Sequence, residues 1–177
     1  NIITSQEVMH INFDDINPDV TFESWNNSST FSLTTNPMPD PVNASNNVGQ
    51  LTAGSDEGGN FDSNIGIGVM NPLNVFTSPF DLTSLDYFKM KIYALEEVTV
   101  TFHIENSPDW GNFLESTASI SASELNQWVE LTFDFEGANN IFMNNIVIKV
   151  SGPDWNVGDF LFFDEIIGPE LYTTPAF

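Results

Sequence analysis

Short runs in which apolar and polar residues alternate fill this chain, separated by turns rich in Gly, Pro, Asn, Asp and Ser. Alternation with a period of two predicts β-strands that bury one face. We expect about ten strands, at residues 8–13, 31–34, 48–53, 64–69, 87–94, 98–105, 112–120, 128–135, 146–151 and 160–167. The only helical candidate is one short turn at 121–127.

Regularly spaced short strands predict an all-β fold, either a β-sandwich or a barrel. The long loops favour a β-sandwich of the jelly-roll type. Residues 87–94 and 98–105, joined at Glu96 and Glu97, form the clearest hairpin in the sequence. The 177 residues are enough for one domain with a real core. We assign 1–170 to that domain and 171–177 to a linker or terminal tail, as expected for one module of a larger multidomain chain.

The charge balance limits the partners of this chain. Its net charge is −22, and its only cationic side chains besides two histidines are Lys89, Lys91 and Lys149. Binding to phosphates needs Lys and Arg, so nucleic acid is excluded, and anionic membranes and strongly anionic polysaccharides are disfavoured. No apolar run approaches 18 residues, so we expect no membrane insertion. A neutral partner or a divalent cation fits best, and the acidity suits salty surroundings, where salt screens self-repulsion.

Two adjacent acids, Asp164 and Glu165, interrupt the apolar run at 160–167. An ionised carboxylate inside a buried strand is costly unless it is paired or metal-bound. Calcium prefers carboxylate, Asn and carbonyl oxygens. Asp14 and Asp15 close the first predicted strand, which we expect to neighbour the last, and the loop at 43–47 offers further oxygens, Asn43 and Asn46 among them. The alternative is that these residues are solvated turn acids and turn asparagines.

Three of the four tryptophans, Trp25, Trp110 and Trp155, fall in predicted loops, whereas Trp128 opens a strand and is assigned to the core. Trp110 and Trp155 share the tripeptide Pro-Asp-Trp. A loop indole beside polar groups suits a sugar site, because the ring stacks on a pyranose and the polar groups bind hydroxyls. The alternative is a ring that folds back to close the end of the sandwich. The hydrogen-bonding candidates beside the two rings are Asp109, Asn112, Asp154 and Asn156.

Catalytic signals are weak. Carboxylates are too abundant to indicate a glycosidase, and the absence of Arg argues against a lyase acting on uronates. His10 and His103 sit in predicted strands and are interpreted as ordinary sheet histidines. His and Cys are not clustered as zinc would require. We therefore expect a protein that is not an enzyme.

The order of several short motifs resembles a known family. They are NFDD at 12–15, NASNNV at 43–48, PFDL at 79–82, FKMKIY at 88–93 with FHIE at 102–105, WVELTFDF at 128–135 and FFDEI at 162–166. The chain resembles the β-jelly-roll carbohydrate-binding modules of family 4 and family 22 type, especially those on glycan-utilisation proteins of marine Bacteroidetes. The resemblance implies a structural calcium held by Asp14, Asp164 and atoms of 43–47. The first-strand acid is typically Glu, so Asp14 and Asp15 remain alternatives.

The resulting hypothesis is a calcium-stabilised module that binds a neutral polysaccharide without catalysis. The first choice is a β-glucan, such as the laminarin-like β-1,3-glucan of algae. We expect it to be secreted or anchored on the outer membrane of a bacterial cell. Two alternatives remain: a calcium-rigidified spacer module of a surface protein, and a sandwich-fold glycan-active enzyme. Whether Trp25, Trp110 and Trp155 share one site is open; with strands that simply alternate, Trp110 and Trp155 lie at opposite ends.

Overall fold

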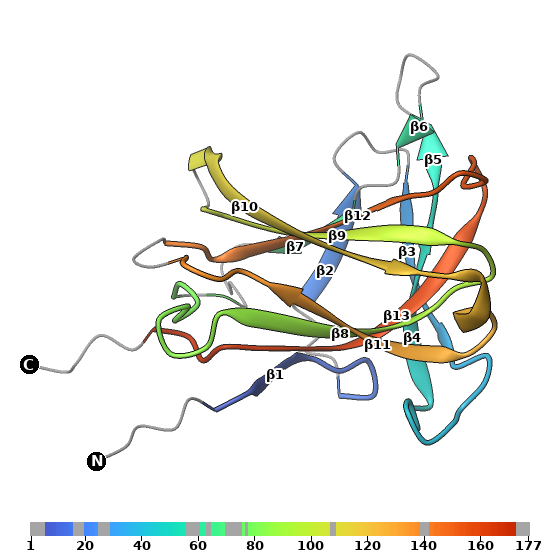
Figure 1. The fold of residues 1–177 in the computed structure, drawn as a ribbon, viewed down its shortest axis with the longest axis horizontal. Helices are drawn as coiled ribbons and strands as arrows, with labels where there is room; N and C mark the ends of the chain where they lie inside the picture. The colour runs from blue at the N-terminus through green and yellow to red at the C-terminus, as the bar shows by residue number, and fades with distance from the viewer. Residues whose placement is uncertain are drawn as a thin grey trace, which may run out of the picture.

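Two antiparallel sheets packed face to face make up the protein (Figure 1). The structure is a computed structural model that describes residues 6–15, 20–24, 29–55, 61–62, 65–69, 76, 78–106, 109–138 and 142–172. The six-stranded sheet contains β11 (Trp128–Asp134), β8 (Tyr87–Tyr93), β13 (Phe160–Gly168), β4 (Asn47–Thr52) and β3 (Thr30–Thr35), with β1 (Val8–Ile11) paired to β13. The five-stranded sheet contains β10 (Asp109–Ile120), β9 (Val98–Asn106), β12 (Asn145–Ser151), β7 (Ile65–Val69) and β2 (Val20–Ser24). A small ribbon pairs β5 (Gly54–Ser55) with β6 (Phe61–Asp62).

The all-β sandwich predicted from the sequence is confirmed, because the alternating apolar residues of both sheets meet in one core. On β8, Phe88, Met90 and Ile92 are fully buried, while the residues between them are partly exposed. On β9, Phe102 and Ile104 are equally buried. Phe88 stacks on Phe102 across the two sheets, with 4.9 Å between ring centroids. Such aromatic packing adds to the stabilisation from apolar burial.

The predicted hairpin of β8 and β9 is wrong. β8 pairs with β11 and β13 in one sheet, whereas β9 pairs with β10 and β12 in the other. The turn at Glu96 and Glu97 therefore carries the chain from one sheet to the other. Alternation shows which face of a strand is apolar, but two apolar faces can meet across a core as well as within one sheet. A further strand, β2, lies in a segment that looked too polar to predict.

The first and last strands are neighbours, as predicted. β13 pairs with β4 over Phe160–Phe163, and beyond that point β1 takes the place of β4, with Ile11 opposite Ile166. Asp164 lies where the partner strand changes, so the loop leaving β1 and the loop entering β4 both reach it. The only helical turn among the described residues is a 3-10 turn, Ala122–Glu124. In that same part of the chain, no helix is long and apolar enough to cross a membrane.

Candidate functional site

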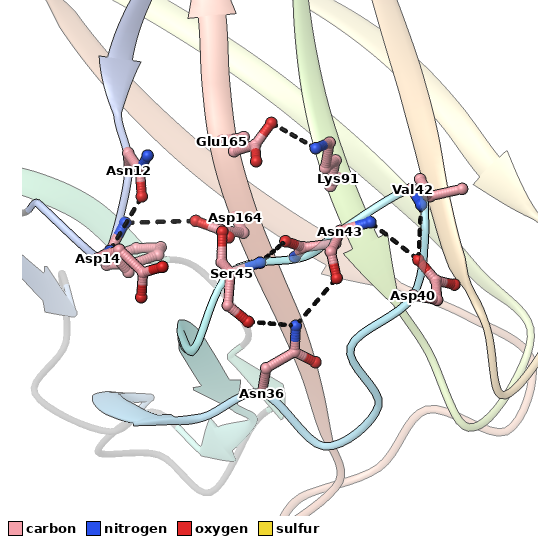
Figure 2. Close-up of polar contacts among 11 residues, drawn as sticks. Asn12, Asp14, Asn36, Asp40, Val42, Asn43, Ser45, Lys91, Asp164 and Glu165 are labelled. Atoms are coloured by element: carbon pink, nitrogen blue, oxygen red, sulfur yellow. Dashed lines mark hydrogen bonds and ion pairs between the residues drawn. The ribbon is translucent and has the colours of Figure 1, made fainter.

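Asp164 is fully buried, and its neighbour Glu165 is not (Figure 2). A bulge separates the two acids: Glu165 has a φ of 47°, and the pairing of β13 with β8 shifts between Asp164 and Ile167. Glu165 turns to Lys91 on β8 and forms an ion pair with it. One of the three lysines therefore neutralises the second acid of the pair. Asp164 has no such cationic partner among the described residues.

The Asp164 carboxylate is only partly satisfied by the protein. Its Oδ1 accepts a hydrogen bond from the Phe13 backbone N–H at 3.3 Å, but its buried Oδ2 has no hydrogen-bond partner in the described structure. Burial raises the pKa of Asp164 above its ordinary value, since it removes the charge from water. The side chains of Ser45 and Asn43 and the backbone N–H groups of Glu165 and Phe13 act in the opposite direction. Buried carboxylate oxygens normally have a hydrogen-bond partner or a bound ion, so this unpartnered oxygen requires an explanation.

The loop between β3 and β4 supplies the other wall of this site, and its own side chains fix its shape. Asn36 is the central residue: its Nδ2 donates to the carbonyl oxygens of Asn43 and Ser45, at 3.3 and 2.9 Å. Asp40 accepts from the backbone N–H groups of Val42 and Asn43, both at 2.8 Å. These bonds hold the buried side chains of Asn43 and Ser45 against Asp164 (Figure 2). The Nδ2 of Asn43, like Asp164 Oδ2, has no hydrogen-bond partner in the part of the chain described.

Asp14 is exposed and ties the end of β1 to the beginning of β4. Its carboxylate accepts from the backbone N–H groups of Asn46 and Asn47 and from their side-chain amides, at 2.8 to 3.4 Å. The backbone bond from Asn46 is the main cause of the lowered pKa of Asp14. The structure thus brings Asp14 to Asn46, and Asp164 to Asn43, on the same loop. Asp15 is exposed, and its backbone N–H closes a turn onto the Asn12 carbonyl.

Hard oxygen donors at Asp164 fit calcium better than any other common metal. The carboxylate and the Ser45 hydroxyl are ligands that calcium accepts, and so is the Asn43 amide oxygen, which already accepts from the Ser45 backbone N–H at 3.1 Å. Among the described residues, no group of three or more His, Cys, Asp or Glu side chains is arranged to hold a metal ion, so any cation at Asp164 would also depend on amide, hydroxyl or carbonyl oxygens. The carbonyls of Asn43 and Ser45 already accept from Asn36. The unpartnered Asp164 Oδ2 is therefore the strongest single feature of a cation site.

The structure places the tryptophans that were predicted to stack on sugar as follows. Trp155 is 6% exposed and packs in the main core, so the prediction that it is a sugar-stacking platform is wrong. The alternative, a ring that closes the end of the sandwich, is what the structure shows. Trp110 lies in β10 rather than in a loop, and its side chain is outside the described structure, as is all of Trp25. Trp110 and Trp155 lie near opposite ends of β9, as expected, since Asp109 pairs with Asn106 and Ser151 with Thr99.

Trp128 is buried, as predicted, but not in the main core. It packs with Val48, Tyr93 and Phe162 in a second cluster on the outer face of the six-stranded sheet. Its indole N–H donates to Asn36 Oδ1 at 3.0 Å. This cluster therefore anchors the same Asn36 that shapes the loop beside Asp164.

The polar sugar-binding candidates divide into two pairs. Asp154 and Asn156 are exposed in the turn before β13, where the Asn156 amide bonds to the Asp154 carbonyl and its backbone N–H bonds to Asp159 at 2.6 Å. Asp154 and Asn156 were proposed to bind sugar hydroxyls beside an exposed Trp155, and because Trp155 is buried that argument no longer applies. Asp109 and Asn112 are exposed at the beginning of β10. Asn112 is followed directly by an exposed aromatic residue that the sequence analysis did not select, Phe113.

Phe113 lies at one end of a polar strip on the outer face of the five-stranded sheet. It is 48% exposed, and the strip continues over β10, β9 and β12. The members of the strip alternate with the buried core residues of these strands; they are Phe113, Glu115, Thr117, Ser119, Thr99, Thr101, Lys149 and Ser151. Thr99 and Ser119 are hydrogen-bonded at 3.0 Å. The strip is rich in hydroxyls and extends about 20 Å from Phe113 to Ser119, at roughly 3.4 Å per residue.

A buried polar network holds Phe113 in place. Its ring stacks on the imidazole of His103, with centroids 4.7 Å apart and planes 19° apart. His103 Nδ1 contacts Glu115 at 2.8 Å, and Nε2 contacts Glu105 at 3.1 Å. Glu105 is fully buried and also accepts from Asn145 at 2.9 Å. Two carboxylates and a stacked ring thus hold the buried His103 in place within the sheet, as suits a histidine with a structural role.

Glu115 connects this network to solvent. Lys149 donates to the same Glu115 Oε1 at 2.5 Å. The Lys149 bond, followed by that from His103, holds the pKa of Glu115 below its ordinary value, so the carboxylate is ionised at neutral pH. Both side chains are about one-third exposed and can still contact a ligand. His103, Glu105 and Val147 are covered, so the accessible part of this face is the polar strip itself.

The strip could have been found in the sequence. Phe113 stands in phase with Glu115, Thr117 and Ser119, which alternate with Leu114 and Ala118. A strict reading of that alternation places Phe113 on the polar face. The prediction followed tryptophans in loops instead, and so missed an aromatic residue on a strand.

Comparisons with known proteins bear on the fold. No protein-family model and no curated protein matches this sequence. A solved family 29 carbohydrate-binding module superposes with a TM-score of 0.58 at 10% identity, covering 94% of this chain and 90% of that one. A mutant of such a module complexed with cellulohexaose has a TM-score of 0.58 at 9% identity and covers 94% and 92%. Another, complexed with mannohexaose, has a TM-score of 0.57 at 10% identity and covers 94% and 93%. The chain therefore has the fold of these modules over almost its whole length.

Proposed function

We propose that this protein is a non-catalytic module that binds a neutral polysaccharide along the polar strip. The observation that carries the proposal is the exposed Phe113 ring, fixed by His103 at the end of a hydroxyl-rich row. An aromatic ring offers a stacking surface to the apolar face of a pyranose, and the Thr, Ser, Glu and Lys side chains bond its hydroxyls. A shallow site of this kind predicts a Kd on the order of micromolar to millimolar.

The expected ligand is neutral because the chain repels anions. The net charge is −22, and the one lysine of the strip, Lys149, is already paired with Glu115. Structural neighbours of this fold were solved with cellulohexaose and with mannohexaose. Our first choice remains a β-glucan, with the laminarin-like β-1,3-glucan of algae ahead of other linkages. Asp109 and Asn112, exposed at the beginning of the same strand, are proposed as additional hydroxyl-binding residues.

We also propose one structural calcium at Asp164. Asp164, Asn43 and Ser45 would hold the ion, and Asp14 and Asn46 would close the loop beside it. Bound calcium supplies the positive charge that the buried Asp164 carboxylate lacks. The protein's part is to orient these oxygens, which Asn36 and Asp40 do through the loop between β3 and β4. The cation would thus stabilise the junction of β1, β4 and β13, on the other sheet from the polar strip.

The proposed setting is a secreted or surface-anchored protein of a marine bacterium of Bacteroidetes type, in which this module accompanies further domains. The high acidity supports a salty environment, in which self-repulsion is screened. A glycan-binding module is useful where polysaccharide is outside the cell.

The test is a titration of the purified protein by isothermal calorimetry with laminarin, cellohexaose and mannohexaose, and with polygalacturonate as the anionic control. We expect saturable binding of a neutral glycan and none of the anion. Phe113→Ala should weaken binding about two- to tenfold, since an aromatic contact contributes about 0.5–1.5 kcal/mol. Leu95→Ala is the matched control, because Leu95 is 43% exposed but lies away from the strip, in the turn after β8.

Each result has a defined reading. Equal loss in Phe113→Ala and Leu95→Ala would contradict the placement of the site. No binding of any neutral glycan, together with a melting temperature that depends on calcium, would favour the spacer module. Release of reducing sugar from any of the glycans would make the protein an enzyme and overturn the non-catalytic proposal.

A further inference from the structure

A pocket lies at the end of the sandwich, apart from the polar strip. Its volume is ≈160 Å³, and it lies between the segment before β8, the segment before β12 and the residues that follow β13. Phe80 and Leu82 form its buried floor, at 2% and 4% exposed. Phe142 and Tyr172 form its rim, at 65% and 50% exposed. Both rings therefore leave a large part of their apolar surface open to a ligand beside the pocket.

Backbone hydrogen bonds hold the three walls together. The Phe80 N–H donates to the Met143 carbonyl at 2.8 Å, and the Tyr172 N–H donates to the Pro79 carbonyl at 2.7 Å. Phe80 also pairs with Leu171 in an isolated bridge. The pocket is therefore formed before any ligand arrives, which lowers the entropy lost on binding.

The floor is equally fixed. The Phe80 ring contacts the rings of Phe76, His10 and Phe88, with centroids 4.9 to 5.3 Å apart. The nearly buried Phe80 is thus held in place by three rings. A rigid base beneath two exposed aromatic rings suits a flat ring with an apolar face.

The polar groups at the opening define the rest of the ligand. Thr83 donates its backbone N–H and its hydroxyl to Asp81 Oδ1, at 3.1 and 2.6 Å. That pair fixes the Asp81 carboxylate at the pocket wall and leaves Oδ2 to accept from a hydroxyl. The Tyr172 hydroxyl is a second polar group on the rim. A carboxylate in a chain of net charge −22 repels an anionic ligand.

We propose that this end pocket binds a single neutral pyranose ring. A closed cavity of about 150 Å³ accepts benzene, so this pocket takes part of one pyranose ring, and the rest of the sugar extends to solvent. The sugar's apolar face lies against the exposed rings of Phe142 and Tyr172, and one of its hydroxyls donates to Asp81. The end pocket shares no residue with the polar strip, so it does not depend on the glycan binding proposed there. The protein then has two sugar contacts, one for a chain along a sheet and one for a single ring.

The test is a 15N-edited NMR titration with methyl β-D-glucopyranoside, with D-glucosamine as the cationic comparison. We expect saturable shifts of the Asp81, Thr83 and Tyr172 amides at concentrations below about 100 mM, as suits one small ring. Phe142→Ala and Tyr172→Ala should each weaken binding about three- to tenfold, the effect of one aromatic contact. Phe113→Ala, on the polar strip, should leave these shifts unchanged.

Other results would overturn the proposal. No shift at these three amides up to that concentration excludes a sugar at the end pocket, whatever the polar strip binds. Stronger binding of D-glucosamine than of the neutral sugar would show that Asp81 selects a cation. Shifts that Phe113→Ala abolishes would move the ligand to the polar strip and leave the end pocket without one. Because Phe142 is mostly exposed, Phe142→Ala keeps the fold and decides the matter even if Tyr172→Ala disturbs the contact of Leu171 with Phe80.

Discussion

The sharpest test of the calcium proposal is the substitution Asp164→Asn. In the absence of metal, the wild-type protein keeps a buried carboxylate oxygen without a hydrogen-bond partner in the described structure. An unsatisfied buried polar group costs about 1–3 kcal/mol of stability, and more when it is charged. Asn has the same shape and no charge, and its Oδ1 can still accept from the Phe13 N–H. We therefore expect Asp164→Asn to be at least as stable as the wild type in chelator.

In the presence of calcium, the wild type should be more stable than Asp164→Asn. A ligand present at 100 times its Kd stabilises the folded state by about 2.7 kcal/mol. For a chain of 177 residues, 1 kcal/mol shifts the melting temperature by about 2–4 °C, so saturating calcium should raise it by about 5–11 °C. Asp164→Asn removes the central ligand and should lose that increase. The assay is differential scanning calorimetry of both proteins in excess calcium and in EDTA.

Asp134→Asn is the matched control, since Asp134 is an exposed acid on β11 in the same sheet. It should keep the full calcium response. A wild-type melting temperature that calcium leaves unchanged would refute the cation site at Asp164. A full response in Asp164→Asn would show that calcium binds elsewhere on this acidic chain.

Three further predictions follow from the described contacts. Burial lowers the pKa of His10, so the folded state keeps the imidazole neutral while the unfolded chain takes up a proton near pH 6.5. The urea concentration at the unfolding midpoint should therefore be highest above that pH and decrease as the pH falls below it. The decrease should be smaller in His10→Gln. Gly49→Ala should lower the free energy of unfolding by about 1–3 kcal/mol, because the new Cβ would lie 2.8 Å from the Phe13 ring. Gly111→Ala is the control and should change the urea midpoint little, since its Cβ would meet only Asp109, at 3.7 Å. Equal midpoints for the two variants would refute the close packing at Gly49. Glu115→Gln should weaken glycan binding in calorimetry without lowering the melting temperature by more than a few degrees, and unchanged affinity would exclude Glu115 from the polar strip's contacts.

The local structure of the strands is largely readable from the sequence. The period of two in β8, β9, β11 and β13 fixes which side chains enter the core, because successive residues of a strand point to opposite faces. The two adjacent acids in β13 signal that something unusual interrupts a buried strand. The neighbouring positions of β1 and β13 also follow from the rule that termini lie close together.

Which strand pairs with which was decided only by the tertiary structure. β8 and β9 have the pattern of a hairpin, yet their apolar faces meet across the core, because alternation identifies the apolar face of each strand but not the sheet to which the strand belongs. Trp155 looked like an exposed loop residue and instead closes the core, since local sequence does not show which way a loop folds back.

The sites depend on the same long-range pairing. Asp164 lies beside Asn43 and Ser45 because β13 changes its partner from β4 to β1 at that position. It has no cationic partner among the described residues because a bulge turns Glu165, and not Asp164, to Lys91. By itself the sequence determined an acidic all-β chain with two adjacent acids inside an apolar strand near its end and only three lysines to pair with them. The tertiary structure decided which oxygens surround that acid and which aromatic rings reach the surface, because both depend on strands that are far apart in the chain.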